Sequence, residues 1–149
     1  MVHKYFRGAH YEIGRRFGAA LAKHGQFLLD NVPYPITQER EAFALSCLPA
    51  YQKFFPEILE EIRGLAEGQH CAPEKLQTVL FSMYAIPPAC GCSCFAVSDG
   101  EHILLGRNSD FSPELEKLNM NVIYRFSDSS CSSIAANCKF CASVPEWNG

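Results

Sequence analysis

Two consecutive prolines, Pro87 and Pro88, divide the sequence into halves in which apolar residues follow different patterns. Proline has no backbone N–H and clashes with the preceding helical turn, so no regular helix runs through this pair. Before it, apolar residues recur at the spacing of amphipathic helices. After it, short apolar runs alternate with turn residues, a pattern typical of strands. The sequence therefore predicts an α+β fold, with helices first and the beginning of a sheet after them.

The first half predicts four helices. Pro56 and Pro73 suit the first turn of a helix, and Gly68 suits a C-terminal cap. Pro49 lies inside the second predicted helix and should split or kink it. The predicted helices cover residues 10–29, 37–55, 56–68 and 73–86.

The second half predicts a hairpin. The runs 93–97 and 102–106 flank Asp99-Gly100, which is a strong turn signal. Neither run alternates cleanly between apolar and polar residues, so both strands should be covered on both faces. A third strand is expected over 121–126. Residues 131–149 show no periodicity and are interpreted as an atypical tail.

Composition narrows the class of protein. The chain has 149 residues, which is enough for one domain with a core. Its net charge is −3 and its basic residues are scattered, so the charge distribution argues against nucleic acid as a partner. The interleaved charges of the helices are interpreted as solvated surface. The uncharged stretch 76–98 contains Pro87 and Gly91, so it is interpreted as buried core rather than a membrane span.

The protein is expected to be soluble and cytoplasmic. Residues 1–29 lack the apolar core of a signal peptide, since Arg15, Arg16 and Lys23 interrupt it. The eight cysteines are therefore expected to be mostly reduced thiols. Cys47 and Cys71 fit the role of small buried apolar residues.

Gly91-Cys92-Ser93, directly before the first predicted strand, permits an unusual reaction. The Cys92 thiolate can attack the Gly91 carbonyl, and hydrolysis of the resulting thioester releases Cys92 as a new N-terminus. Glycine before the nucleophile tolerates the strained backbone that this attack requires. The freed residue then carries a thiol nucleophile and an α-amino group that serves as its general base.

The hairpin should return Arg107 and Asp110 towards Cys92. Asp110 could orient the new amino group. Arg107 could favour the thiolate or receive a substrate carboxylate. The alternatives that remain open are a buried structural thiol for Cys92, a loop residue for Asp110 and a surface charge for Arg107.

Several motifs together resemble the N-terminal-nucleophile hydrolases, and within them the linear-amide hydrolases of the choloylglycine-hydrolase and isopenicillin-N-acyltransferase type. The similarity spans residues 8–126. The motifs are His10-Tyr11-Glu12-Ile13-Gly14-Arg15, the segment 56–68, Cys92-Ser93, Phe95-Ala96-Val97, Asp99-Gly100 and Gly106-Arg107-Asn108-x-Asp110.

The resemblance implies a helical prosegment over 1–91 and an αββα sandwich that begins at residue 92. It implies autocatalytic cleavage between Gly91 and Cys92, with Cys92 as nucleophile and Asp110 as acidic partner. Arg107 matches the arginine of the bile-salt-hydrolase branch. The implied substrate is a small acyl amide, such as an N-acyl amino acid, a conjugated bile acid or a β-lactam precursor, and no metal or cofactor is implied. Hydrolysis and acyl transfer both remain open.

The family continues through further strands and an asparagine of the oxyanion hole. Residues 131–149 do not resemble that continuation, so a truncated or frame-altered product with little turnover is expected. Loss of one oxyanion donor alone costs about a hundredfold in rate.

Two alternatives come from other classes. One is a zinc-binding structural module, because Cys90, Cys92 and Cys94 form a C-x-C-x-C run and Cys138 and Cys141 form a C-x-x-C pair. The other is a non-catalytic helical fragment that forms a homo-oligomer and exposes an apolar patch.

Overall fold

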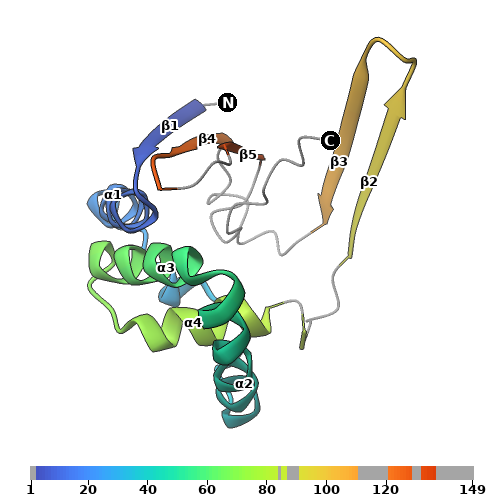
Figure 1. The fold of residues 1–149 in the computed structure, drawn as a ribbon. Coiled ribbons are helices and arrows are strands. Elements are labelled where there is room, and N and C mark those ends of the chain that lie inside the picture. The colour runs from blue at the N-terminus through green and yellow to red at the C-terminus, as the bar shows by residue number, and fades with distance from the viewer. Residues whose placement is uncertain (1–2, 84, 87–90, 111–120, 129–131, 137–149) are drawn as a thin grey trace.

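The computed structural model describes residues 3–83, 85–86, 91–110, 121–128 and 132–136. Within these ranges, side chains are described for 5–83, 85–86, 95–102, 104 and 123–128. The elements combine helices and strands, which confirms an α+β architecture (Figure 1). In chain order they are β1 (His3–Gly8), α1 (His10–Lys23), the 3-10 helix η1 (Leu29–Asn31), α2 (Gln38–Phe54), α3 (Pro56–Gly68), α4 (Pro73–Ser82), β2 (Gly91–Ser98), β3 (Ile103–Asp110), β4 (Asn121–Phe126) and β5 (Ser132–Ala136).

The strands form two separate sheets. One has the order β1-β4-β5, with β1 parallel to β4 and β4 antiparallel to β5. The other is the β2–β3 hairpin, which stands apart from the helices in Figure 1. The structure corrects the interpretation of the tail, since Ser132–Ala136 forms β5 through backbone pairing with β4. Because β1 pairs with β4, the N-terminal segment contributes a strand to a sheet of the C-terminal segment.

A core of buried apolar side chains joins the helices to the β1-β4-β5 sheet. Phe6 on β1 lies edge-on to Phe17 on α1 at 5.6 Å between ring centroids and stacks on Tyr124 of β4 at 6.0 Å. Most helical members have the predicted spacing, and Ala44 and Phe81 are additions to it. The helical members are Ile13, Phe17 and Leu21 of α1, Ala44 of α2, Ile62, Leu65 and Ala66 of α3, and Leu76, Val79 and Phe81 of α4.

Helices α1 and α3 pack backbone against backbone. A Cβ added at Gly64 would overlap the carbonyl oxygen of Tyr11 and lie 2.9 Å from the backbone nitrogen of Arg15. One added at Gly14 would overlap the carbonyl oxygen of Glu61 in the same way. Only glycine permits this approach, so these positions fix the distance between the two helices.

The first predicted helix is too long. α1 ends at Lys23. The backbone N–H of His24 donates to the carbonyl oxygen of Leu21, and Gly25 follows with φ +67°, the left-handed backbone conformation with which helices commonly end. Leu28 is still buried, since its N–H donates to Oε1 of Gln69 at 2.7 Å.

Pro49 does not split α2. The helix runs unbroken from Gln38 to Phe54. Pro49 lies on the exposed side, and the carbonyl left without its usual donor belongs to Leu45, which is 64% exposed. Water can satisfy that carbonyl, so the helix continues.

The prediction that both hairpin strands are covered on both faces is wrong for the side chains described there. Phe95, Val97 and Leu104 are 58%, 57% and 63% exposed. Of the side chains described in the uncharged stretch 76–98, Leu76, Val79 and Met83 are buried as predicted, whereas Phe95 and Val97 are exposed. Among the described residues, no helix has the length and apolar character that crossing a bilayer requires.

Candidate active site

The candidate nucleophile lies at the start of the hairpin. β2 and β3 pair antiparallel, with Gly91 opposite Asp110 and Cys92 opposite Ser109. Opposite Cα atoms in such a ladder are about 4.5–5.5 Å apart. The predicted return of the second strand is therefore confirmed for the backbone, and it sets Asp110 across from the proposed cleavage site.

Arg107 occupies the same half of the hairpin. It is paired with Cys94, two positions along the strand from Cys92. The side chains of Cys92, Arg107 and Asp110 lie outside the described residues, so their roles stay predictions.

The turn that sets this register is built by Asp99. Its Oδ1 accepts the backbone N–H groups of Glu101 at 3.0 Å and His102 at 2.7 Å. These bonds hold the pKa of Asp99 below its ordinary value, and the bond from His102 contributes most to this lowering. Gly100 adopts φ +95°, which suits glycine. The Asp-Gly signal therefore predicts the turn correctly.

Upstream of the candidate site, buried Arg40 on α2 binds the end of α4. Its Nη1 donates to the carbonyl oxygen of Ser82 at 3.0 Å and to the hydroxyl of Ser82 at 3.1 Å. Its Nη2 donates to the carbonyl oxygen of Ile86 at 2.5 Å. Ile86 is the last described residue before Gly91. We call Arg40, Ser82 and Ile86 the α4 clasp.

Tyr34 contacts both Arg40 of the α4 clasp and the backbone of α4. The Arg40 guanidinium lies over the Tyr34 ring at 3.8 Å from the centroid. The Tyr34 hydroxyl donates to the carbonyl oxygen of Val79 at 3.0 Å. Burial raises the pKa of Tyr34, although the nearby Arg40 charge lowers it, so the phenol keeps its proton for this bond.

A second polar cluster joins α1 to the end of β4. Asp128 accepts the His10 backbone N–H at 3.0 Å and lies 2.8 Å from His10 Nδ1. The His10 ring stacks on Phe126 at 3.8 Å between centroids. Burial raises the pKa of Asp128, but the bonds from the His10 backbone and ring outweigh it, so the net shift is downward.

Glu61 on α3 belongs to the same region. Its Oε2 is buried and has no hydrogen-bond partner among the residues that the structure describes. Burial, and then the charge of Asp128, raise the pKa of Glu61 to about 7. A buried carboxyl group without a partner avoids the cost of desolvation by holding its proton.

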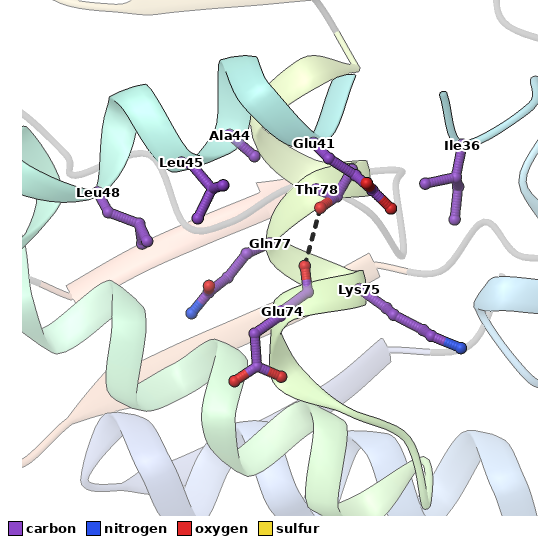
Figure 2. A pocket seen from close by; sticks show the side chains of 9 residues that line it. All are labelled: Ile36, Glu41, Ala44, Leu45, Leu48, Glu74, Lys75, Gln77 and Thr78. Atoms are coloured by element: carbon purple, nitrogen blue, oxygen red, sulfur yellow. Dashed lines mark hydrogen bonds between the residues drawn. The ribbon is translucent and has the colours of Figure 1, made fainter. Parts of the chain in front are cut away.

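A shallow groove lies between α2 and α4 (Figure 2). Its volume is about 220 Å³, smaller than a typical small-molecule site. Apolar side chains on one side include Leu45 and Leu48, whereas Glu74 and Lys75 extend from α4. The residues that line it include no cysteine or histidine, so the groove offers no thiol or imidazole for catalysis.

The alternative of a zinc module is not tested at its own residues. Cys90, Cys138 and Cys141 lie outside the described residues, as do the side chains of Cys92 and Cys94. In the part of the chain that is described, no group of three or more metal-binding side chains occurs. Cys47 and Cys71 are free thiols packed against the core, but they are half-buried rather than buried as predicted.

The helices contain polar residues whose importance the sequence did not indicate. Arg40 and Glu61 were grouped with the solvated surface, yet both have buried polar atoms. Gln69 is also buried, and its Nε2 donates to the carbonyl oxygens of Gly18 and Gln26. These residues stand among other charged and polar side chains, so their spacing gives no signal that separates them.

A scan against known protein families gave no match, and the search of curated proteins gave none either.

Proposed function

We propose that this chain is a self-processing cysteine amidase or acyltransferase of the N-terminal-nucleophile type, with Cys92 as its nucleophile. The proposal rests on one observation above the others. The β2–β3 register sets the backbone of Asp110 opposite Gly91 and that of Arg107 opposite Cys94. A hairpin with this register brings the backbones of Cys92, Arg107 and Asp110 within four consecutive residue pairs.

The first step is cleavage of the chain. Cys92 Sγ attacks the carbonyl carbon of Gly91, the C–N bond to Cys92 breaks, and the nitrogen takes up the thiol proton. Water then hydrolyses the thioester, which leaves a carboxylate on Gly91 and restores the thiol of Cys92. The products are the segments 1–91 and 92–149, joined by strand pairing between β1 and β4.

The second step is turnover at an external amide. The new α-amino group, with an ordinary pKa of about 8, accepts the thiol proton while sulfur attacks the substrate carbonyl. The same group then donates that proton to the leaving amine, and an acyl thioester forms on Cys92. Water completes hydrolysis, whereas a second amine completes acyl transfer. The substrate class is a small linear acyl amide.

Asp110 is assigned the role of orienting the amino group, and Arg107 that of stabilising the thiolate or binding a substrate carboxylate. The αββα sandwich belongs to this proposal, as a finer form of the α+β architecture.

A reagent selective for N-terminal cysteine tests the proposal chemically. A cyanobenzothiazole condenses with a thiol and an amine on adjacent carbons, so it labels Cys92 only after cleavage. We expect one adduct on the purified protein, which peptide mapping places on a fragment that begins with Cys92. Cys92→Ala should lose the adduct, whereas Cys47→Ala should keep it. Labelling absent from a folded wild-type chain would contradict the proposal.

A second candidate function, a self-associating module, is favoured by a different observation. Phe95, Val97 and Leu104 lie on one face of the hairpin, and each is more than half exposed. Natural sheet edges usually carry charges or proline, but β2 has neither between Gly91 and Ser98. A second copy could cover this face.

This candidate predicts an oligomer that depends on the hairpin. By sedimentation velocity, the wild-type chain should sediment as a dimer or larger, and Phe95→Ser with Leu104→Ser should shift it to a monomer. Exchanging exposed Leu45 and Phe54, which lie on α2, for serine should leave the oligomer unchanged. A monomeric wild type at micromolar concentration would rule this candidate out.

A further inference from the structure

We propose that Arg40 is a positioning residue for cleavage between Gly91 and Cys92, through the α4 clasp. The inference rests on the proposed function. Arg40 lies far from the cleavage site in the sequence, and nothing in the spacing of the helical residues indicates it. The two are related along the chain, because Arg40 binds Ile86, five positions before Gly91.

The α4 clasp fixes the chain where α4 ends. Three hydrogen bonds run from one guanidinium to Ser82 and Ile86. The Ile86 backbone N–H also donates to the Ser82 carbonyl oxygen at 3.0 Å, so a backbone hydrogen bond closes the turn after α4. The direction in which the chain leaves α4 is therefore fixed by Arg40 of α2, which lies more than 40 positions earlier in the sequence.

The clasp limits how far the cleavage site can move. Five chain steps separate the Cα atoms of Ile86 and Gly91, and an extended chain spans at most about 3.5 Å per step. The Gly91 Cα thus lies within about 17 Å of the Ile86 Cα. On its other side, Gly91 pairs with Asp110. The attack of Cys92 on its own preceding carbonyl requires a strained geometry, and the proposal assigns to the clasp the anchoring of the chain before that bond.

The environment of Arg40 indicates that its buried charge has a function. Arg40 is 6% exposed, and no carboxylate among the described residues forms an ion pair with it. Burying an uncompensated charge is costly. Here the partial negative charge of the α4 C-terminus and the face of Tyr34 offset part of that cost.

The test compares cleavage rates in variants of the full chain. Arg40→Met keeps the apolar stem and removes all three donated bonds, whereas Arg40→Lys keeps the charge. Arg63→Met is the matched control, because Arg63 is an exposed arginine of α3 that pairs with Glu60. Each rate is measured by mass spectrometry on newly synthesised chain, from pH 6 to 9, and divided by the folded fraction from circular dichroism.

We expect Arg40→Met to cleave about tenfold or more slowly per folded molecule, Arg40→Lys to recover part of the rate, and Arg63→Met to match the wild type. The pH at half-maximal rate should stay unchanged in Arg40→Met, because the clasp does not alter the ionisation of Cys92. A loss explained wholly by unfolding, or no loss at all, would overturn the role of Arg40 while leaving the proposed function intact. A wild-type chain that never cleaves would overturn both.

Should Arg40→Met fail to fold, Ser82→Ala decides the question. It removes one acceptor of the clasp and leaves the backbone carbonyl in place. A rate per folded molecule that is several-fold lower supports positioning by the clasp, and an unchanged rate contradicts it.

Discussion

Replacing Gly64 with alanine is expected to destabilise the protein by about 3 kcal/mol, even though alanine is the better helix former. In an unconstrained helix interior the exchange would stabilise by about 1 kcal/mol. Here the added methyl group would overlap the carbonyl oxygen of Tyr11 on α1. That atom belongs to backbone, so one helix must move and disturb the core between Ile13 and Leu65. Urea unfolding followed by circular dichroism measures the difference.

The sign of the change in unfolding free energy shows whether the α1–α3 packing or the helix propensity of alanine dominates at Gly64. Gly25→Ala is the matched control. Gly25 has φ +67° with no other atom within 4 Å of an added Cβ, so only backbone strain of about 1–2 kcal/mol is expected there. If Gly64→Ala proved neutral or stabilising, α1 and α3 would not pack as closely as the structure shows.

The free energy of unfolding is expected to fall by about 2.5 kcal/mol between pH 5 and pH 8 because of Glu61. Burial and then Asp128 raise the pKa of this carboxyl from 4.5 to about 7. The folded state therefore holds the proton more tightly than the unfolded chain. The associated stability is fully present below about pH 4.5 and is lost as the pH rises to about 7.

Glu61→Gln should remove this dependence and make the protein more stable than the wild type at pH 8, since the amide cannot ionise. Glu60→Gln is the control, because Glu60 is exposed on the same helix, and it should keep the wild-type slope. Asp128 shifts in the opposite direction, so its contribution is lost only in more acidic solution, as the pH falls through its lowered pKa. Thermal unfolding across pH 5–8 gives the answer, and a flat wild-type profile would refute the role of Glu61.

Regular patterns allowed much of the fold to be predicted. The helical spacing with Pro56 places α3 correctly, although its C-cap is Gln69 rather than Gly68 as predicted, and the third predicted strand coincides with β4. Asp99-Gly100 predicts the hairpin, and with it the return of Asp110 to Gly91. These features are local, so neighbouring residues determine them.

The features that were missed depend on contacts between distant segments. Of the side chains described in β1, only Phe6 is buried, and the strand forms because β4 offers a parallel partner more than 110 residues later. β5 likewise depends on β4 rather than on its own Ser- and Ala-rich sequence. Arg40 gains its role from the end of α4. No local pattern carries such information.

The central claim is that the peptide bond between Gly91 and Cys92 breaks by the chemistry of Cys92 itself. The most direct measurement is the intact mass spectrum of freshly purified chain, with Cys92→Ala and Cys94→Ala beside it. The account predicts two fragments, 1–91 and 92–149, whose masses sum to the whole chain plus one water, for the wild type and Cys94→Ala, and one uncut chain for Cys92→Ala. A single uncut mass for a folded wild type, or the same two fragments from Cys92→Ala, would contradict it.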